Sequence, residues 1–219
     1  MPSKDVVFRS FPHNNLWTFY RFNRTNFINL ISKNNLPYLI SLGNFLENVW
    51  SQKGFVPHYL FNKDKSIRVT SFSEKKKDVF DEEMLSQSIV NVSRFKSFTD
   101  EGMRLYESGK EHGKRLSRHN CSLVPILETD KNSLSIETPL WLYKYLVGKD
   151  WVPVTGHIDL VQFIDGKIWI FDYKPDDSPL VWEQISNYRK ILMSMLPNIK
   201  LSDIRVGWFD NFNEYVVKV

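Results

Sequence analysis

The sequence predicts a mixed α/β fold, in which helices pack on a central β-sheet. Three observations support this: an apolar hairpin pattern over 157–174, an amphipathic helical pattern over 180–195, and a further β-rich segment over 204–209. Placing the helix beside the final strand gives a mixed sheet with helices packed on it. The chemistry of the chain is expected to lie in the hairpin.

The hairpin, His157–Lys174, consists of two apolar runs on either side of Asp165–Gly166. Asp-Gly is favoured in two-residue hairpin loops of type I′, because both positions need a positive φ. A loop closed in this way pairs Ile164 with Lys167 and sets the register of the whole ladder. Counting back along the ladder, Asp159 comes to lie opposite Asp172.

Directly opposed residues share a face of a sheet, so the carboxylates of Asp159 and Asp172 would repel each other. A divalent cation is the natural compensating partner. Lys174 lies two residues beyond Asp172, and the strand period of two puts it on the same face. The alternative is a satisfied polar pair at the end of the sheet, bridged by Lys174. Because Asp is depleted from strands, the cation site is the preferred interpretation.

The bulk composition is that of an ordinary globular protein with a mildly basic net charge of +4 over 219 residues. Such a charge is compatible with a polyanionic partner. The single cysteine, Cys121, excludes an internal disulfide framework and any all-cysteine metal site. No signal-peptide pattern or membrane-spanning apolar run is present, so a cytoplasmic, intracellular protein without a membrane partner is expected; organellar or viral origin stays open.

The first half of the chain is expected to be mostly helical. Helices are predicted over Asn14–Ser32 and Tyr38–Lys53, followed by a hairpin over Phe55–Phe72 and two helical pieces over Asp78–Ser117. Glu47 lies in the second helix, where the pattern alone makes it a solvated surface residue.

The second half is expected to form the sheet. Short strands are predicted over Leu123–Leu127 and Leu134–Ile136, before the central hairpin. After the hairpin come the helix Leu180–Met195 and a strand pair over Ile204–Phe209 and Tyr215–Val219. Pro197 ends the helix.

A basic run lies between the two halves, in HGKRLSRH over 112–119. Its Lys114, Arg115 and Arg118 would suit binding along a nucleic-acid backbone. They would equally suit an exposed helix end, where cations interact favourably with the helix dipole. The run leaves both interpretations open.

Three motifs of the second half resemble the PD-(D/E)XK nuclease superfamily and, within it, the RecB-like branch. They are G-x-x-D at Gly156–Asp159, D-x-K at Asp172–Lys174 and Q-x-x-x-Y at Gln184–Tyr188. The resemblance implies a restriction-endonuclease-like core over 121–219, preceded by a mostly helical part over 1–120, in a single nuclease domain.

The first motif of that branch is a helix with G-x-x-x-H, and Gly43–Glu47 resembles it with glutamate in place of histidine. Other branches of the superfamily use a glutamate from this helix, so the resemblance makes Glu47 the first metal ligand. Glu111–His112 is a weaker competitor. The four-cysteine iron–sulfur cluster of some relatives is excluded by the single cysteine.

The resemblance also implies the roles of the site residues. Glu47, Asp159, Asp172 and the Tyr173 carbonyl would hold one or two Mg²⁺ or Mn²⁺ ions. Lys174 would position the water nucleophile or stabilise developing charge. Gln184 and Tyr188, one helical turn apart, would steady the site and contact nucleic acid.

The function expected from residues and resemblance together is metal-dependent hydrolysis of DNA phosphodiester bonds. An exonuclease or single-strand- or end-directed enzyme of DNA replication, recombination or repair is the first interpretation. A structure-directed endonuclease, or a catalytically impaired nucleic-acid-binding module of the same fold, is the alternative. A further alternative is a subunit that docks a helicase or recombination partner and cuts only in complex.

Overall fold

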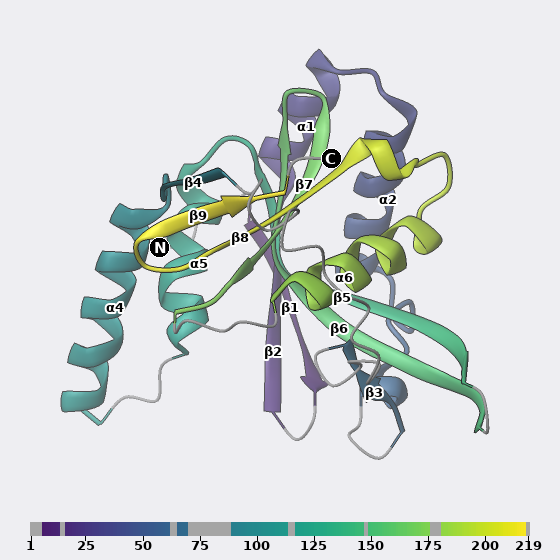
Figure 1. The fold of residues 1–219 in the computed structure, drawn as a ribbon, viewed down its shortest axis with the longest axis horizontal. Helices are drawn as coiled ribbons and strands as arrows, with labels where there is room; N and C mark the ends of the chain where they lie inside the picture. Colours follow the sequence, from purple (N-terminus) through teal and green to yellow (C-terminus); the bar gives the residue numbers. More distant parts are fainter. Residues whose placement is uncertain are drawn as a thin grey trace.

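A computed structural model describes residues 6–13, 16–61, 65–69, 89–113, 117–146, 149–175 and 181–217 (Figure 1). The described residues form one nine-stranded sheet and five α-helices. The helices are α1 (Arg24–Lys33), α2 (Pro37–Ser51), α4 (Lys96–Glu111), α5 (Arg118–Thr129) and α6 (Val181–Met195), with 3₁₀ turns at His58–Phe61 and Leu201–Asp203. No helix in these ranges combines the length and apolar character needed to cross a membrane.

The sheet is mixed but mostly antiparallel. Its strands are β1 (Val6–His13), β2 (Leu16–Asn23), β3 (Ile67–Arg68), β4 (Ile89–Val92), β5 (Ser133–Leu146), β6 (Lys149–Ile164), β7 (Lys167–Tyr173), β8 (Ile204–Phe209) and β9 (Asn213–Val216). Eight of them follow the order β1-β2-β5-β6-β7-β8-β9-β4, and β3 pairs with β6. β7 and β8 are parallel and joined through α6, as the crossover pattern predicted. The prediction of a mixed α/β fold is confirmed at this level.

The central hairpin has the predicted register. Asp165 and Gly166 have φ values of 50° and 71°, so both loop positions are left-handed, as type I′ geometry requires. Ile164 pairs with Lys167, and the ladder of β6 and β7 runs without a bulge to Leu160 opposite Phe171. The backbone pairing ends there, one residue short of the two aspartates.

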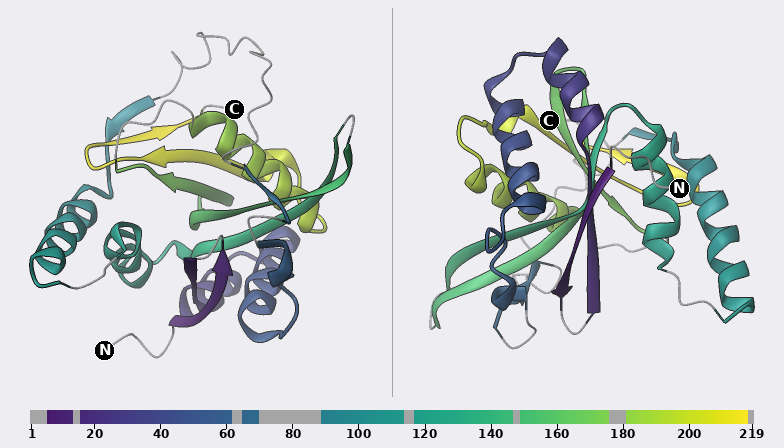
Figure 2. Two further views of the ribbon diagram at one scale, coloured as in Figure 1. Left: turned by 90° about the horizontal axis from the view of Figure 1, so that it is seen from below. Right: turned by 180° about the vertical axis from the view of Figure 1, so that it is seen from behind.

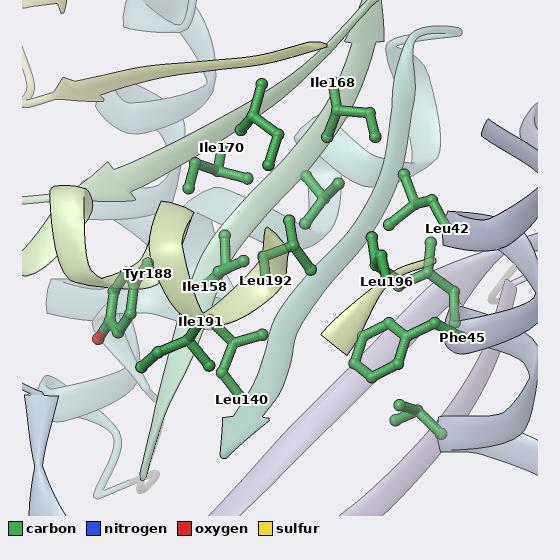
Figure 3. Close-up of a cluster of buried hydrophobic side chains, with 14 of the residues drawn as sticks. Leu42, Phe45, Leu140, Ile158, Ile168, Ile170, Tyr188, Ile191, Leu192 and Leu196 are labelled. Atoms are coloured by element: carbon green, nitrogen blue, oxygen red, sulfur yellow. The ribbon is translucent and has the colours of Figure 1, made fainter. Parts of the chain in front are cut away.

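Two hydrophobic clusters hold the sheet between its helices. The larger cluster joins α2 and α6 to the strands, and in Figure 3 Tyr188, Ile191 and Leu192 of α6 lie over Leu140 and Ile158 of β5 and β6. The smaller cluster contains α5 and the buried rings Phe95, Phe171, Tyr173 and Phe209. The different views of Figure 2 show α4 and α5 together at one end of the molecule and α6 on the sheet away from them.

The structure corrects the predicted first helix, Asn14–Ser32. Its first part is strand β2, paired with β1 in a long hairpin, and only Arg24–Lys33 is helical. Tyr20 and Phe22 are buried while Phe19 is exposed, which is the alternation of a half-buried strand. Asn23 then caps α1, since its side chain accepts a hydrogen bond from the backbone N–H of Asn26.

The hairpin predicted over Phe55–Phe72 is wrong for its described residues. They contain a 3₁₀ turn and the two-residue strand β3, which pairs in parallel with β6. Of the helical region predicted over Asp78–Ser117, residues 78–88 lie outside the described ranges, 89–92 form strand β4, and 96–111 are helix α4. The part over 1–120 therefore holds several strands of the sheet and is less helical than predicted.

The predicted strand Leu123–Leu127 is also wrong, because these residues belong to α5. The Ser117 side chain caps that helix by accepting from the backbone N–H of Asn120. By contrast, the predicted helices Tyr38–Lys53 and Leu180–Met195 and the final strand pair correspond to α2, α6, β8 and β9. Helix α5 begins at Arg118 and so contains His119, which the predicted strand did not include.

Candidate metal centre

The candidate site lies where β6 and β7 separate beyond their last backbone pair. Asp159 and Asp172 are the first residues past Leu160 and Phe171 on the two strands, and both are buried. The backbone N–H of Tyr173 is no longer used in the ladder and donates to Asp159 Oδ2 at 2.8 Å. The point where the two strands separate, called the fork below, therefore keeps the two carboxylates adjacent. The register counted from the loop predicted this adjacency, although no backbone pair joins the two residues.

Lys174 and Gln184 both contact Asp172. The Lys174 Nζ lies 2.5 Å from Asp172 Oδ2, so the strand period placed this lysine correctly. On the other side, Gln184 Nε2 of α6 donates to Asp172 Oδ1 at 2.9 Å and to the Tyr188 hydroxyl at 2.9 Å. The amide thus orients one aspartate and connects it to the aromatic ring on α6.

Two residues from elsewhere in the chain complete the cluster: His119 of α5 and Glu137 of β5. The His119 Nδ1 lies 3.6 Å from Asp159 Oδ2 and 3.8 Å from Glu137 Oε1. One ligand atom from each of these three residues lies within 4.8 Å of the other two. The spacings from Nδ1 are too long for hydrogen bonds. They fit ligands about 2.1 Å from a shared ion, which lie at most about 4.2 Å apart.

Glu137 reaches the cluster through an unusual backbone conformation. Its φ is 53°, in the left-handed region, although it lies within strand β5. Its neighbours Ile136 and Thr138 keep their pairing with β6, so the irregularity is confined to one residue. A non-glycine residue in this region costs on the order of 1–3 kcal/mol, and such strain is found preferentially at functional sites.

Asp159 and Asp172 are buried, Glu137 is largely buried beside them, and this environment changes the protonation of all three carboxyl groups. Burial, reinforced by the charges of Asp159 and Asp172, raises the pKa of Glu137 to about 8. Burial and the Asp159 charge raise the pKa of Asp172 to about 7, against the opposing effect of Lys174. Burial raises the pKa of Asp159 to about 6. At neutral pH the cluster therefore holds protons that a bound cation would displace.

His119 is a neutral donor in this setting. Burial lowers its pKa below the ordinary value, and the positive charges of Lys174 and Arg118 act in the same direction, against the effect of Asp172. A neutral imidazole offers one nitrogen lone pair to a metal. Its ring also lies against Tyr173, with the ring centroids 5.4 Å apart.

The donor set fits a divalent cation. Carboxylate oxygens are the ligands preferred by Mg²⁺ and Mn²⁺, and an imidazole nitrogen suits Mn²⁺ and later transition metals better than Mg²⁺. The residues that could hold the ion are His119, Glu137 and Asp159, with Asp172 beside them. Two of these, His119 and Glu137, were not predicted from the sequence as site residues.

Glu47 lies away from this cluster in the structure. Its carboxylate accepts from Arg24 Nε at 3.0 Å, and the guanidinium of Arg24 also lies over the Trp50 ring. This places Glu47 in the partly exposed contact between α1 and α2. The structure therefore does not bring Glu47 together with Asp159 and Asp172.

Of the predicted nucleic-acid-binding residues, Lys114 and Arg115 lie outside the described ranges. Arg118 is half-buried in the first turn of α5, where its Nε points to Met103 Sδ of α4 at 3.0 Å. The predicted pair Gln184 and Tyr188 lies at the cluster. Tyr173 is fully buried, and its backbone N–H contacts Asp159.

The missed histidine had a recognisable signal in the sequence. Ser117 is a preferred N-cap residue, and a helix that begins there puts His119 in its first turn. Glu137 had no comparable signal, because its left-handed backbone is not visible in a strand pattern. The chain matches no protein-family model, and no curated protein is significantly similar to it. The site therefore has to be interpreted from its own geometry.

Proposed function

We propose that this protein is a metal-dependent nuclease that hydrolyses DNA phosphodiester bonds. The observation that carries the proposal is the convergence of Glu137, Asp159 and Asp172 with His119 and Lys174 at one fork of the sheet. Closely spaced acids whose pKa values are raised mainly by burial are costly to ionise unless a cation compensates them. A lysine beside such a cation site suits chemistry on a phosphate.

A divalent cation held by His119, Glu137 and Asp159 would lower the pKa of a water molecule and neutralise charge on a phosphate. Two side chains of the protein, Lys174 and Gln184, would act beside this cation. Lys174, held against Asp172, presents an ammonium that would stabilise negative charge developing on phosphate oxygens. Gln184 would keep Asp172 oriented through its amide hydrogen bond.

The resemblance to the RecB-like branch of the PD-(D/E)XK superfamily supports the proposal when it is applied to a different helix. That branch places a histidine on the helix of its first motif, and His119 on α5 lies at the acidic cluster as such a histidine would. We therefore propose His119 in the role that Glu47 was expected to have. A restriction-endonuclease-like core, built around α5, β5–β7 and α6, belongs to the same proposal.

The test is cleavage of end-labelled single- and double-stranded DNA with Mg²⁺ or Mn²⁺, using wild type, Asp172→Ala and Lys174→Ala. Asp100→Ala and Lys110→Ala, both on α4, serve as matched controls. Metal-dependent cleavage that only the first two substitutions abolish supports the proposal. The product ladder then distinguishes attack at ends, our first expectation, from attack within the strand.

Two results would count against it. Cleavage that survives Asp172→Ala and Lys174→Ala would mean that another site performs the reaction. Absence of cleavage with either metal, while DNA binding is kept, would favour a binding module. If cleavage appears only after a helicase or recombination protein is added, the chain acts as a subunit of a larger nuclease.

A further inference from the structure

A pocket of about 120 Å³ lies between α6 and the β5–β6 strand pair. Its walls are largely apolar, with Leu142 and Ile191 among the side chains that form them. Three polar side chains also line it: Lys144, Asn187 and Lys190. No acidic side chain is among the described residues that line the pocket, so these residues combine apolar walls with positive charge.

Tyr188 lies near both a wall residue of this pocket and the acidic cluster. A Cβ at Gly156 would lie 2.5 Å from the Tyr188 ring and 3.2 Å from Val69, so glycine here permits the ring to lie directly on β6. Val69 also lines the pocket. On its polar side, the Tyr188 hydroxyl accepts from Gln184, which binds Asp172. Tyr188 is therefore close to Val69 of the pocket wall and is linked through Gln184 to Asp172 of the cluster.

A basic residue of β3 adds positive charge near both the pocket and the cluster. Arg68 is exposed and precedes Val69, which lines the pocket. It is close enough to Glu137 and Tyr188 for its positive charge to act on both. A nucleic-acid strand that runs from the cluster to the pocket would therefore lie near the positive charge of Arg68, which attracts its phosphates.

From these observations we infer that the pocket holds one pyrimidine nucleotide of the strand being cleaved, an inference that rests on the proposed function. The apolar walls suit the faces of a flat ring, and the Asn187 amide can both donate to and accept from a base edge. Lys144 and Lys190 suit its phosphate. A closed apolar cavity of about 150 Å³ holds a single benzene ring, so a six-membered base fits this pocket better than a purine.

The inference is tested first without cleavage, by titrating metal-free protein with thymidine 5′-monophosphate and following backbone amide shifts by NMR. We expect shifts at residues around Asn187–Ile191, and weaker binding of adenosine and guanosine 5′-monophosphates. Leu142→Trp fills the pocket and should weaken thymidine monophosphate binding at least tenfold. Leu105→Trp, at an exposed site on α4, should leave it unchanged.

A second variant avoids any change to the core. Lys190 is exposed, so Lys190→Gln should leave folding intact and weaken binding about fivefold, whereas Lys110→Gln on α4 should have no effect. Binding that persists unchanged in both Leu142→Trp and Lys190→Gln, or purine nucleotides that bind as tightly as pyrimidines, would overturn the inference. So would shifts that map to another surface.

Cleavage gives an independent measurement on the same variants. An abasic residue moved along a single-stranded oligothymidine substrate should slow cleavage at least fivefold at one position relative to the cut, and Leu142→Trp should remove this positional effect. A uniform response at all positions contradicts the inference. Nucleotide binding in the pocket without metal-dependent cleavage would refute the proposed function and leave the pocket in place, so the two failures are distinguishable.

Discussion

The candidate metal centre has two halves, one formed by residues of a single hairpin and the other by residues that are distant in the sequence. Asp159, Asp172 and Lys174 lie within one hairpin, whose register follows from a two-residue loop. His119 and Glu137 come from α5 and β5, which reach the same point only through tertiary packing and one left-handed residue. The relative positions of the hairpin residues could be predicted from the sequence by counting the register, whereas those of His119 and Glu137 could not. Whether both halves act as one site is the question that experiments can decide.

The largest expected effect is that of neutralising one carboxylate in each half. If the halves form a single centre, Glu137→Gln should reduce metal-dependent cleavage as severely as Asp172→Asn, each on the order of 10²–10³-fold. Both substitutions keep the side-chain volume, so circular dichroism should show the wild-type fold. Initial cleavage rates at saturating metal provide the measurement.

Glu128→Gln is the matched control, because Glu128 is exposed near the end of α5 and should give wild-type rates. A normal rate for Glu137→Gln together with an inactive Asp172→Asn would separate the halves. The hairpin would then carry the chemistry without β5, and the strain at Glu137 would need another explanation.

The next effect concerns metal affinity. His119→Ala removes the one nitrogen ligand of the cluster and should weaken Mn²⁺ binding about 10–100-fold, with a smaller loss for Mg²⁺, which depends less on imidazole. Calorimetric titration of both metals measures the two losses. The difference between the metals is the readout that a purely structural role would not produce.

His112→Ala provides the control, since His112 is exposed at the end of α4 and its Nδ1 contacts only the Ser108 carbonyl among the bonds described. Unchanged Mn²⁺ affinity in His119→Ala would show that the α5 histidine packs beside the cluster without binding metal. The hairpin carboxylates would then have to hold the ion without it.

The same contrast explains how much was predictable. The register from Ile164 to Leu160, the helix α6 and the position of Lys174 all follow from local rules of turns and periodicity. The predicted strand in α5 is wrong because an apolar run of five residues fits either a strand or a helix, and only the Ser117 cap favours the helix. Glu47 was selected from a motif spacing, which carries no information on where α2 packs.

Protonation offers a third way to test the coupling of the halves, through the stability of metal-free protein between pH 6.5 and 8.5. Burial, together with the charges of Asp159 and Asp172, raises the pKa of Glu137 to about 8. A carboxyl with a raised folded-state pKa keeps its proton where the unfolded chain has lost it, so stability falls as pH rises toward 8 and levels off above it. The expected loss is about 2 kcal/mol, which lowers Tm by roughly 4–8 °C.

Thermal unfolding in EDTA across this range measures the slope. Glu137→Gln should make the slope shallower, leaving the smaller contribution of Asp172, and should raise Tm most at pH 8.5. Added Mn²⁺ should stabilise wild type more at pH 8.5 than at pH 6.5, because its ligands must lose their protons. A slope that is equally steep in Glu137→Gln would mean that Glu137 titrates independently of folding.

The smallest expected effect distinguishes the two helices that compete for the first ligand. Glu47 is paired with Arg24 in a contact where both side chains are partly exposed, and such pairs contribute on the order of 0.5 kcal/mol. Glu47→Gln should therefore change Tm by no more than about 2 °C and leave the cleavage rate within twofold of wild type. Cleavage assays beside His119→Ala check this directly. A strong loss in Glu47→Gln with normal activity in His119→Ala would return the first ligand to α2, and would require α2 to move toward the hairpin when metal and DNA bind.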